Sequence, residues 1–207
     1  RVLETAVAHA DGTPVLAGIG ALRTRDVMAL AADAQEAGAA AVLLAPVSYQ
    51  PLTPDEVYGL YEDATAELSV PLVVYDNPTT TRFAFTVELY ARIAELPGIA
   101  SIKIPGVPAD PARAREHVAA IRAVVPERVT IGVSGDASAV TGLNAGCDAW
   151  YSVIGGTLPA PALAIVGAVR DGRTADPTSE SDRMAPLWAL FAEFGSLRVT
   201  AAIAEHL

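Results

Sequence analysis

The sequence predicts an α/β protein in which parallel strands are covered by helices. Short, continuously apolar runs alternate with longer segments whose apolar residues keep helical spacing. Continuous apolar runs are typical of strands buried on both faces of a parallel sheet. Strand starts recur about every 29 residues through the fifth strand, which fits βα units better than a solenoid. Six strands, each followed by a helix, form the predicted architecture.

The first half of the chain supplies three of these strands. We expect strands at residues 14–20, 41–46 and 71–75, and helices at residues 1–10, 24–38 and 53–69. The clearest helix start is the segment from Thr53 to Glu56. Thr53 is suited to the N-cap, Pro54 to the first helical position, and Glu56 to the reciprocal half of a capping box.

The second half continues the alternation. Its strands are expected at residues 99–104, 129–134 and 149–154, and its helices at residues 86–96, 112–125, 137–145 and 159–170. Residues 171–181 form a polar, turn-rich stretch, and two further helical segments run to the end. We therefore expect residues 1–170 to form part of a barrel with six βα units, and residues 171–207 to form a C-terminal helical segment.

Two parallel folds fit this order of elements, a (β/α)8 barrel and an open doubly wound sheet. No Gly-x-Gly-x-x-Gly fingerprint follows the first strand and no Walker A loop is present in the sequence. Polar residues gather just after several strands, where a barrel builds its active site, and this favours the (β/α)8 TIM barrel. Because a full barrel needs about 250 residues, we expect about two βα units to be absent in front of Arg1. Helical ends without start or stop signals are also expected of a part of a larger protein.

Composition limits the classes of partner. Apolar residues make up 52% of the chain and the net charge is −10, so a sizeable core is expected and nucleic acid or an acidic membrane is not. The sequence contains no signal peptide and no run of about eighteen apolar residues, so no membrane span is expected. Cys147 is the single cysteine; it cannot form an internal disulfide and is interpreted as a core residue. These features favour the cytoplasm and a small-molecule partner.

Lys103 is the most informative residue in the sequence. It is the only lysine, because the other 13 of the 14 basic residues are arginines, and it lies between Ile102 and Ile104 in an expected strand. Burial disfavours the ammonium form and lowers the pKa of lysine, which makes the amine a nucleophile suited to Schiff-base chemistry. A lysine at a strand end can also extend its ammonium group into water. Spacing alone leaves both interpretations open.

Tyr75 ends the strand before that of Lys103 and precedes it by 28 residues. Neighbouring strands lie about 4.8 Å apart, so a phenol and an amine on the same side can reach one small molecule. The phenol can then relay protons while the amine forms a carbinolamine and an imine. The alternative is that Tyr75 closes the core with its hydroxyl in water.

At these residues the sequence resembles the dihydrodipicolinate synthase / N-acetylneuraminate lyase family of pyruvate-type class I aldolases. The resemblance spans the chain, and its motifs are residues 14–18, 46–51, 75–78, 102–103 and 134–136. It implies a (β/α)8 barrel, a homo-oligomer (dimer or tetramer), and no cofactor or metal. It also implies that Lys103 forms the Schiff base with a 2-oxo acid and that Tyr75 shuttles protons. Gly135 and Tyr151 stand at positions that line the family's substrate pocket.

Several positions differ from the family pattern. Ser48 stands where many members lend a tyrosine across a subunit interface, and Tyr49 is a substitute one residue later. Thr80 stands where the synthases have a carboxylate-binding arginine, with Arg82 two residues on, and Asn77 lies in the same motif. We expect Ser48, Tyr49, Asn77 and Thr80 to be substrate-binding residues. The family's Gly-Thr-Thr-Gly-Glu loop, which holds the pyruvate carboxylate, would precede Arg1.

The resulting hypothesis is a Schiff-base-forming lyase, either an aldolase or a dehydratase, that acts on pyruvate or a related 2-oxo acid. The departures at Ser48 and Thr80 count against the alternative of 4-hydroxy-tetrahydrodipicolinate synthase proper. A non-catalytic barrel that binds a ligand or assembles with partners is the alternative from another class. A phosphate-binding barrel with Gly155-Gly156 at a helix N-terminus is weaker, because glycines there more often only make the turn.

Overall fold

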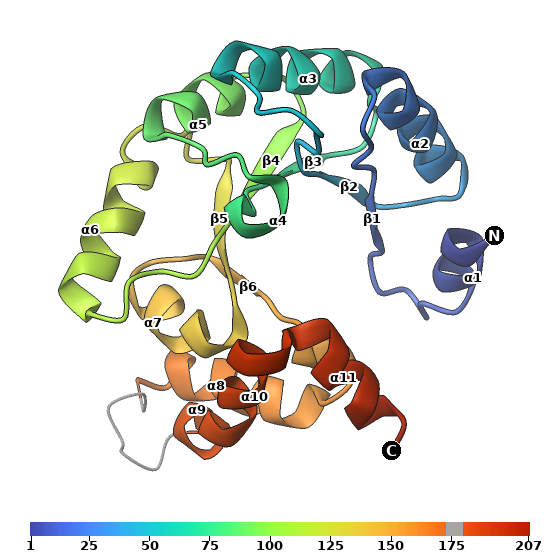
Figure 1. Ribbon diagram of the computed structural model, residues 1–207. Coiled ribbons are helices and arrows are strands. Elements are labelled where there is room, and N and C mark those ends of the chain that lie inside the picture. Colours follow the sequence, from blue (N-terminus) through green and yellow to red (C-terminus); the bar gives the residue numbers. More distant parts are fainter. Residues whose placement is uncertain (173–179) are drawn as a thin grey trace. The chain divides into compact units, whose positions relative to one another are not determined.

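The computed structural model describes residues 1–172 and 180–207, so most of the predicted polar stretch at 171–181 lies outside the described residues. Its six strands form one sheet in chain order, from β1 to β6, and each described strand pairing is parallel (Figure 1). Sequential parallel pairing with intervening helices is the arrangement of a (β/α) barrel, and it confirms the predicted α/β class.

The chain divides into two compact units, and the first comprises residues 1–104 and 120–131. Its elements, in chain order, are α1 (Val2–Ala8), β1 (Leu16–Gly18), α2 (Thr24–Glu36), β2 (Ala41–Leu44), α3 (Pro54–Glu67), β3 (Leu72–Tyr75), α4 (Pro78–Thr81), α5 (Val87–Ala94) and β4 (Ile99–Ile104). The end of α6 (Pro111–Arg122) and the start of β5 (Thr130–Ser134) also belong to it. The predicted domain boundary at residue 170 stays a prediction.

The pairing of β3 with β4 contains one irregularity that decides which side chains meet. Leu72 is opposite Ile99, but Val73 is opposite Ser101, so Ala100 is an extra residue in β4. Because side chains alternate between the faces of a strand, one extra residue moves every later side chain to the other face. Tyr75 is therefore opposite Lys103, whereas uninterrupted pairing from Leu72 would have placed it opposite Ile102.

Helices α2, α3 and α5 lie along one side of β1–β4 (Figure 1). Helix α3 begins with the predicted capping box: the Glu56 amide donates to Thr53 Oγ1 at 3.3 Å, and the Thr53 amide donates to Glu56 Oε2 at 2.7 Å. From this helix the buried Tyr61 donates its hydroxyl hydrogen to the Leu44 carbonyl at the end of β2, at 2.6 Å. The helix layer is thus fixed to the strand ends by hydrogen bonds as well as by apolar packing.

The second unit comprises residues 105–119 and 132–207. Besides most of α6 and the end of β5 it contains η1 (Asp136–Ser138), α7 (Ala139–Asn144), β6 (Ala149–Tyr151), η2 (Ile154–Gly156), α8 (Pro159–Arg170), α9 (Glu180–Arg183), α10 (Ala185–Phe194) and α11 (Ser196–Ala204). Its buried Asp136 accepts hydrogen bonds from the Trp150 indole and from the Val153 and Ile154 amides. These bonds join the end of β5 to the turn after β6. Cys147 is buried, as predicted.

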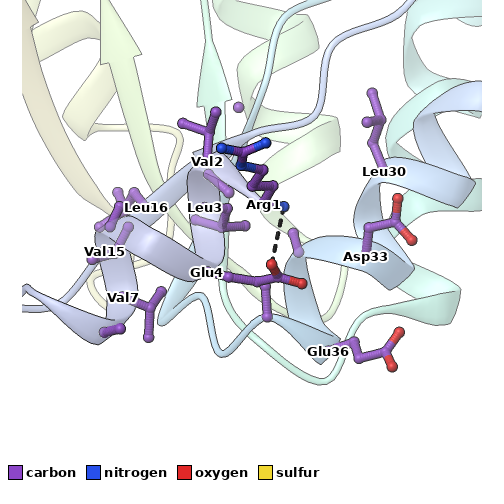
Figure 2. A pocket seen from close by; sticks show the side chains of 16 residues that line it. Arg1, Val2, Leu3, Glu4, Val7, Val15, Leu16, Leu30, Asp33 and Glu36 are labelled. Carbon is purple, nitrogen blue, oxygen red and sulfur yellow. Dashed lines mark ion pairs between the residues drawn. The ribbon is translucent and has the colours of Figure 1, made fainter.

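Helix α1 borders an open groove on the outer edge of β1. None of the residues of this helix, which the structure describes in full, is buried, although Leu3 and Val7 are apolar. The groove has a volume of about 970 Å³. Figure 2 shows Leu3, Val7 and Leu16 on one side of it and Leu30 of α2 on the other. An apolar groove beside an edge strand is suited to contact with a further structural element.

Several elements differ from their predicted form; residues 180–207, for example, form three helices where two helical segments were predicted. Helix α4 occupies a segment predicted to be a loop; Pro78 stands at its first position, where proline's fixed φ angle favours a helical turn. The sixth strand ends at Tyr151, and the Gly155-Gly156 pair lies in the single turn η2, where the Gly155 amide donates to Ser152 Oγ.

Among the residues that the structure describes, no single helix is long and apolar enough to cross a membrane. The bent pair of α10 and α11 passes that test only when the two helices are taken together, by length and composition.

The pairing of β5 with β6 depends on the absence of a side chain at Gly132. A Cβ atom at Gly132 would overlap the ring of Tyr151, two residues beyond its partner Ala149 on β6. We predict that Gly132→Ala lowers the free energy of unfolding by about 1–3 kcal/mol, the usual cost of overpacking a core. Urea denaturation measures the change. In the Tyr151→Ala background, which lacks the ring, Gly132→Ala should lower the free energy of unfolding much less than it does in the parent protein. An equal loss in the parent and in the Tyr151→Ala background would contradict the contact.

Candidate functional site

Tyr75 and Lys103 meet at the carboxyl ends of β3 and β4. They are opposite each other in the register, and Lys103 Nζ lies 4.0 Å from the centroid of the Tyr75 ring. Both side chains are half-buried. The ladder continues one residue further, because the Asp76 amide donates to the Lys103 carbonyl at 3.0 Å. The two backbones are therefore held side by side at the point where the amine and the phenol meet.

Asn77 completes this cluster from the loop after β3. Its Nδ2 donates to the Tyr75 hydroxyl oxygen at 3.0 Å. Asn77 occupies the N-cap position of α4, where an asparagine side chain usually accepts a hydrogen bond from the first turn of the helix. The Asn77 side chain makes no such capping hydrogen bond. The Asn77 amide is committed to Tyr75 instead.

The other predicted binding residues of the first unit lie on nearby segments. Ser48 is half-buried in the loop after β2 and its Oγ accepts a hydrogen bond from the Gln50 amide. Tyr49, beside it, is 89% exposed. Thr80 is exposed on α4, and Arg82 ends that helix in the left-handed region, with φ of 57°. The structure thus brings Asn77, Tyr75 and Lys103 into contact and places Tyr49 and Thr80 toward solvent.

Gly135 and Tyr151 belong to the second unit, at the carboxyl ends of β5 and β6. Tyr151 is opposite Ser134 in the register, and Gly135 follows Ser134 with a φ of 81°, a conformation that favours glycine. Their predicted role in binding a substrate stays a prediction.

Sequence reasoning gave no role to Asp76, which the structure places in the core of the first unit. Its Oδ2 accepts a 2.6 Å hydrogen bond from the hydroxyl of the buried Tyr90 on α5. Burial raises the pKa of Asp76, and the hydrogen bond from Tyr90 offsets only part of that rise. Burial and then the Asp76 charge raise the pKa of Tyr90. The one feature of the sequence that could have indicated a role for Asp76 is its position directly after an apolar strand.

No cluster of three or more His, Cys, Asp or Glu side chains suited to a metal ion occurs in residues 1–172 and 180–207.

The fold and the site together define a protein of the (β/α)-barrel class with a lysine and a tyrosine paired at the carboxyl ends of neighbouring strands. The chain belongs to the dihydrodipicolinate synthetase family, whose model matches residues 1–205. The family predicted from the sequence motifs is thereby confirmed.

Relatives in this family carry consistent names. The chain is 29% identical over 197 residues to the 4-hydroxy-tetrahydrodipicolinate synthase of Nitrobacter hamburgensis, covering 94% of this chain and 64% of the relative. It is 30% identical over 206 residues to the enzyme of that name from Thiobacillus denitrificans, covering 99% and 68%. The chain thus spans about two thirds of the length of these relatives.

Solved structures of dihydrodipicolinate synthases are also similar to this chain. The crystal structure of dihydrodipicolinate synthase from Agrobacterium tumefaciens matches with a TM-score of 0.93 at 45% identity, covering 99% of this chain and 69% of that one. The chloride-inhibited enzyme from Acinetobacter baumannii, complexed with pyruvate, matches with a TM-score of 0.83 at 25% identity, covering 99% and 69%.

The raised pKa of Asp76 predicts a pH-dependent contribution to stability. Because the folded chain holds this proton to a higher pH than the unfolded chain, the contribution is full below the unfolded-state pKa and is lost as pH rises through the folded-state pKa. The titratable groups that face Asp76 are Tyr90 on α5 and Tyr61 on α3, whose pKa values its charge raises. We therefore predict that Asp76→Asn gains stability relative to the parent protein as pH rises from acid to neutral.

Chemical denaturation at a series of pH values measures this difference. Asp63→Asn, which alters an exposed aspartate on α3, is the matched control. The same pH dependence in both variants, or a loss of relative stability for Asp76→Asn with rising pH, would contradict the assignment.

Proposed function

We propose that this chain carries the catalytic pair of a Schiff-base-forming lyase, an aldolase or dehydratase, that acts on pyruvate or a related 2-oxo acid. The observation that carries the proposal is the placement of Lys103 Nζ 4.0 Å from the centre of the Tyr75 ring. Membership of the dihydrodipicolinate synthetase family and the names of the relatives support it. Lys103 is the nucleophile and Tyr75 the proton relay.

The proposed chemistry begins with attack of the neutral amine of Lys103 on the ketone carbon of the 2-oxo acid. The carbinolamine that results loses water and leaves a cationic iminium on Nζ. The iminium draws electrons from the neighbouring carbon, so that a proton can leave from it or a carbon–carbon or carbon–oxygen bond one position further can break. A cation beside an aromatic face is stabilised by about 0.5–2 kcal/mol, and the Tyr75 ring offers such a face.

Tyr75 is placed to move the protons that these steps require. The carbonyl oxygen needs a proton to leave as water, and later steps need one added or removed. Because the Asn77 amide donates to the Tyr75 oxygen, the hydroxyl hydrogen of Tyr75 is left to point toward a substrate. The same amide stabilises the phenolate after the proton has been given away. We therefore propose Asn77 as a residue that orients Tyr75, and Ser48, Tyr49, Thr80, Gly135 and Tyr151 as contacts to the substrate.

We also propose that about two βα units of the barrel precede Arg1 in the complete protein and carry the loop that holds the substrate carboxylate. The chain's share of its relatives, 64% and 69% of two matched proteins, supports this arrangement. The groove beside β1 supports it further, because a preceding strand would pair with that edge and cover Leu3, Val7 and Leu16 (Figure 2).

The second candidate function is 4-hydroxy-tetrahydrodipicolinate synthase itself, which the names of the relatives favour. Thr80 and Ser48 count against it, because neither supplies the charge or the phenol of the synthases. A non-catalytic barrel remains the alternative from another class. We further propose a cytoplasmic homo-oligomer, a dimer or tetramer, in which Tyr49 is exposed enough to reach a second subunit.

The proposal predicts a covalent adduct on Lys103. The complete gene product is incubated with pyruvate and sodium borohydride, and peptide masses are mapped. We expect the lysine-containing peptide of residues 99–106 to gain the mass of reduced pyruvate, and we expect no such gain in Lys103→Ala. Lys103→Arg, which keeps the charge, is the matched control and should also remain unmodified.

A folded protein whose Lys103 stays unmodified with pyruvate and with longer 2-oxo acids would overturn the lyase proposal and leave the non-catalytic barrel. If the adduct forms, consumption of the semialdehyde co-substrate at the rate of a true synthase would identify the second candidate, and its absence would favour another aldolase or dehydratase.

Tyr75→Phe separates proton relay from ring packing. The variant keeps the aromatic face beside Lys103 but loses the hydroxyl, so we expect the adduct to form more slowly by about 10²-fold or more, as for loss of a general acid. Asn77→Leu should cause a smaller loss, of about tenfold, because Tyr75 remains but is no longer oriented. Stopped-flow trapping of the adduct measures both rates. A Tyr75→Phe variant with parental rates would contradict the relay.

A further inference from the structure

Asp76 is a buried carboxyl that the proposed chemistry does not use. It is 5% exposed and directly follows Tyr75, so its side chain leaves the strand on the face opposite to Tyr75 and Lys103 and enters the helix layer. Its backbone amide remains in the sheet, where it donates to the Lys103 carbonyl at 3.0 Å. One residue thus connects the backbone of the lysine strand with the helices behind the sheet.

The helix end of this connection is rigid. Tyr90, on α5, donates to Asp76 Oδ2 at 2.6 Å. Its ring stacks on Phe85, with centroids 5.4 Å apart and planes 8° from parallel. Phe85 in turn meets Phe83 and Tyr61 edge to face. Packing on this scale leaves the Tyr90 hydroxyl one position, and therefore fixes the carboxyl that accepts from it.

Burying the Asp76 carboxyl lowers the stability of the fold. In the part of the chain that the structure describes, Asp76 Oδ1 accepts no hydrogen bond. Burial has the largest effect on the pKa of Asp76 and raises it, whereas the Tyr90 hydrogen bond and then the Phe85 backbone lower it. A buried polar atom without a partner costs about 1–3 kcal/mol. A buried carboxyl kept at such a cost directly beside the catalytic pair indicates a role in the geometry of that pair, because proteins tolerate such costs mainly at functional sites.

We propose that Asp76 is a positioning residue that, held by Tyr90, fixes the end of β3 so that Tyr75 stays over Lys103. The inference rests on the proposed Schiff-base function. Asp76 acts through Tyr75 and touches neither the amine nor a substrate. Loss of the hydrogen bond from Tyr90 would allow the segment after Tyr75 to shift, and a displacement of about 1 Å is enough to cost up to 10²-fold in rate.

Tyr90→Phe and Thr65→Val form a matched pair for the test. Tyr90→Phe removes a buried hydroxyl that donates to Asp76 Oδ2 at 2.6 Å, whereas Thr65→Val removes a buried hydroxyl that donates to the Tyr61 carbonyl at 2.9 Å, within α3. In the complete gene product two rates are measured: borohydride-trapped adduct formation with pyruvate, and acetylation of Lys103 by acetic anhydride, read by peptide mapping. Acetylation needs no substrate.

We expect Tyr90→Phe and Asp76→Ala to slow adduct formation by about tenfold and to speed acetylation by about threefold, because the amine loses its cover. Thr65→Val should leave both rates within about twofold of the parent, although it too loses a buried hydrogen bond and about 1 kcal/mol of stability. Asp76→Asn keeps an acceptor for Tyr90 and should rescue both rates relative to Asp76→Ala.

Equal effects of Tyr90→Phe and Thr65→Val on the two rates, or no effect of Tyr90→Phe, would overturn the positioning role. If the parent protein forms no adduct, the proposed function fails, and acetylation of Lys103 then decides the positioning role by itself. The failure of the function and the failure of the positioning role are therefore separate results.

Discussion

The register between β3 and β4 is the constraint on which the site depends. An extra residue at Ala100 shifts the later part of β4 by one position and sets Lys103 opposite Tyr75. The same shift keeps Ile102 and Ile104 buried on the other face. Because side chains alternate along the strand, the same irregularity places the isoleucines in the core on one face and Lys103 beside Tyr75 on the other. The contact of the Lys103 ammonium group with the Tyr75 ring follows from this register.

The helix layer gives this register its rigidity. Two buried tyrosine hydroxyls reach strand ends from behind: Tyr61 binds the Leu44 carbonyl, and Tyr90 binds Asp76. Aromatic packing around Phe85 joins them. On the opposite face, Tyr75 and Lys103 at the strand ends are half-buried, whereas Val73 and Ser101 before them are buried. The buried hydrogen bonds that hold the strand ends lie on the helix side of the sheet, and the proposed reactive groups lie on the opposite face, as the (β/α) architecture allows.

Much of this could be predicted from the sequence, because it depends on local pattern. The order of strands and helices follows from apolar runs and periodicity, and the capping box at Thr53 follows from its own four residues. The proximity of Tyr75 and Lys103 follows from parallel pairing of consecutive strands. The family follows from short motifs along the chain, and the family model confirms it.

Other features depend on contacts between distant residues and could not be predicted. The extra residue at Ala100 leaves no mark in the sequence, so the face on which Lys103 lies was undetermined. The Tyr75 hydroxyl was expected to be available to a substrate, but its partner, Asn77, was assigned to substrate binding. Asp76 received no role, because only the fold brings Tyr90 to it from a helix 14 residues later. Long-range side-chain pairs of this kind are set by packing, which single-sequence reasoning cannot resolve.

The most direct test of the account is a crystal structure of the complete gene product after borohydride reduction of its pyruvate adduct. We expect continuous electron density from Lys103 Nζ to the second carbon of the former pyruvate, with the Tyr75 ring beside it and Asn77 still bound to the Tyr75 hydroxyl. An unmodified Lys103 with the acid bound elsewhere, or an adduct from which Tyr75 is turned away, would contradict it.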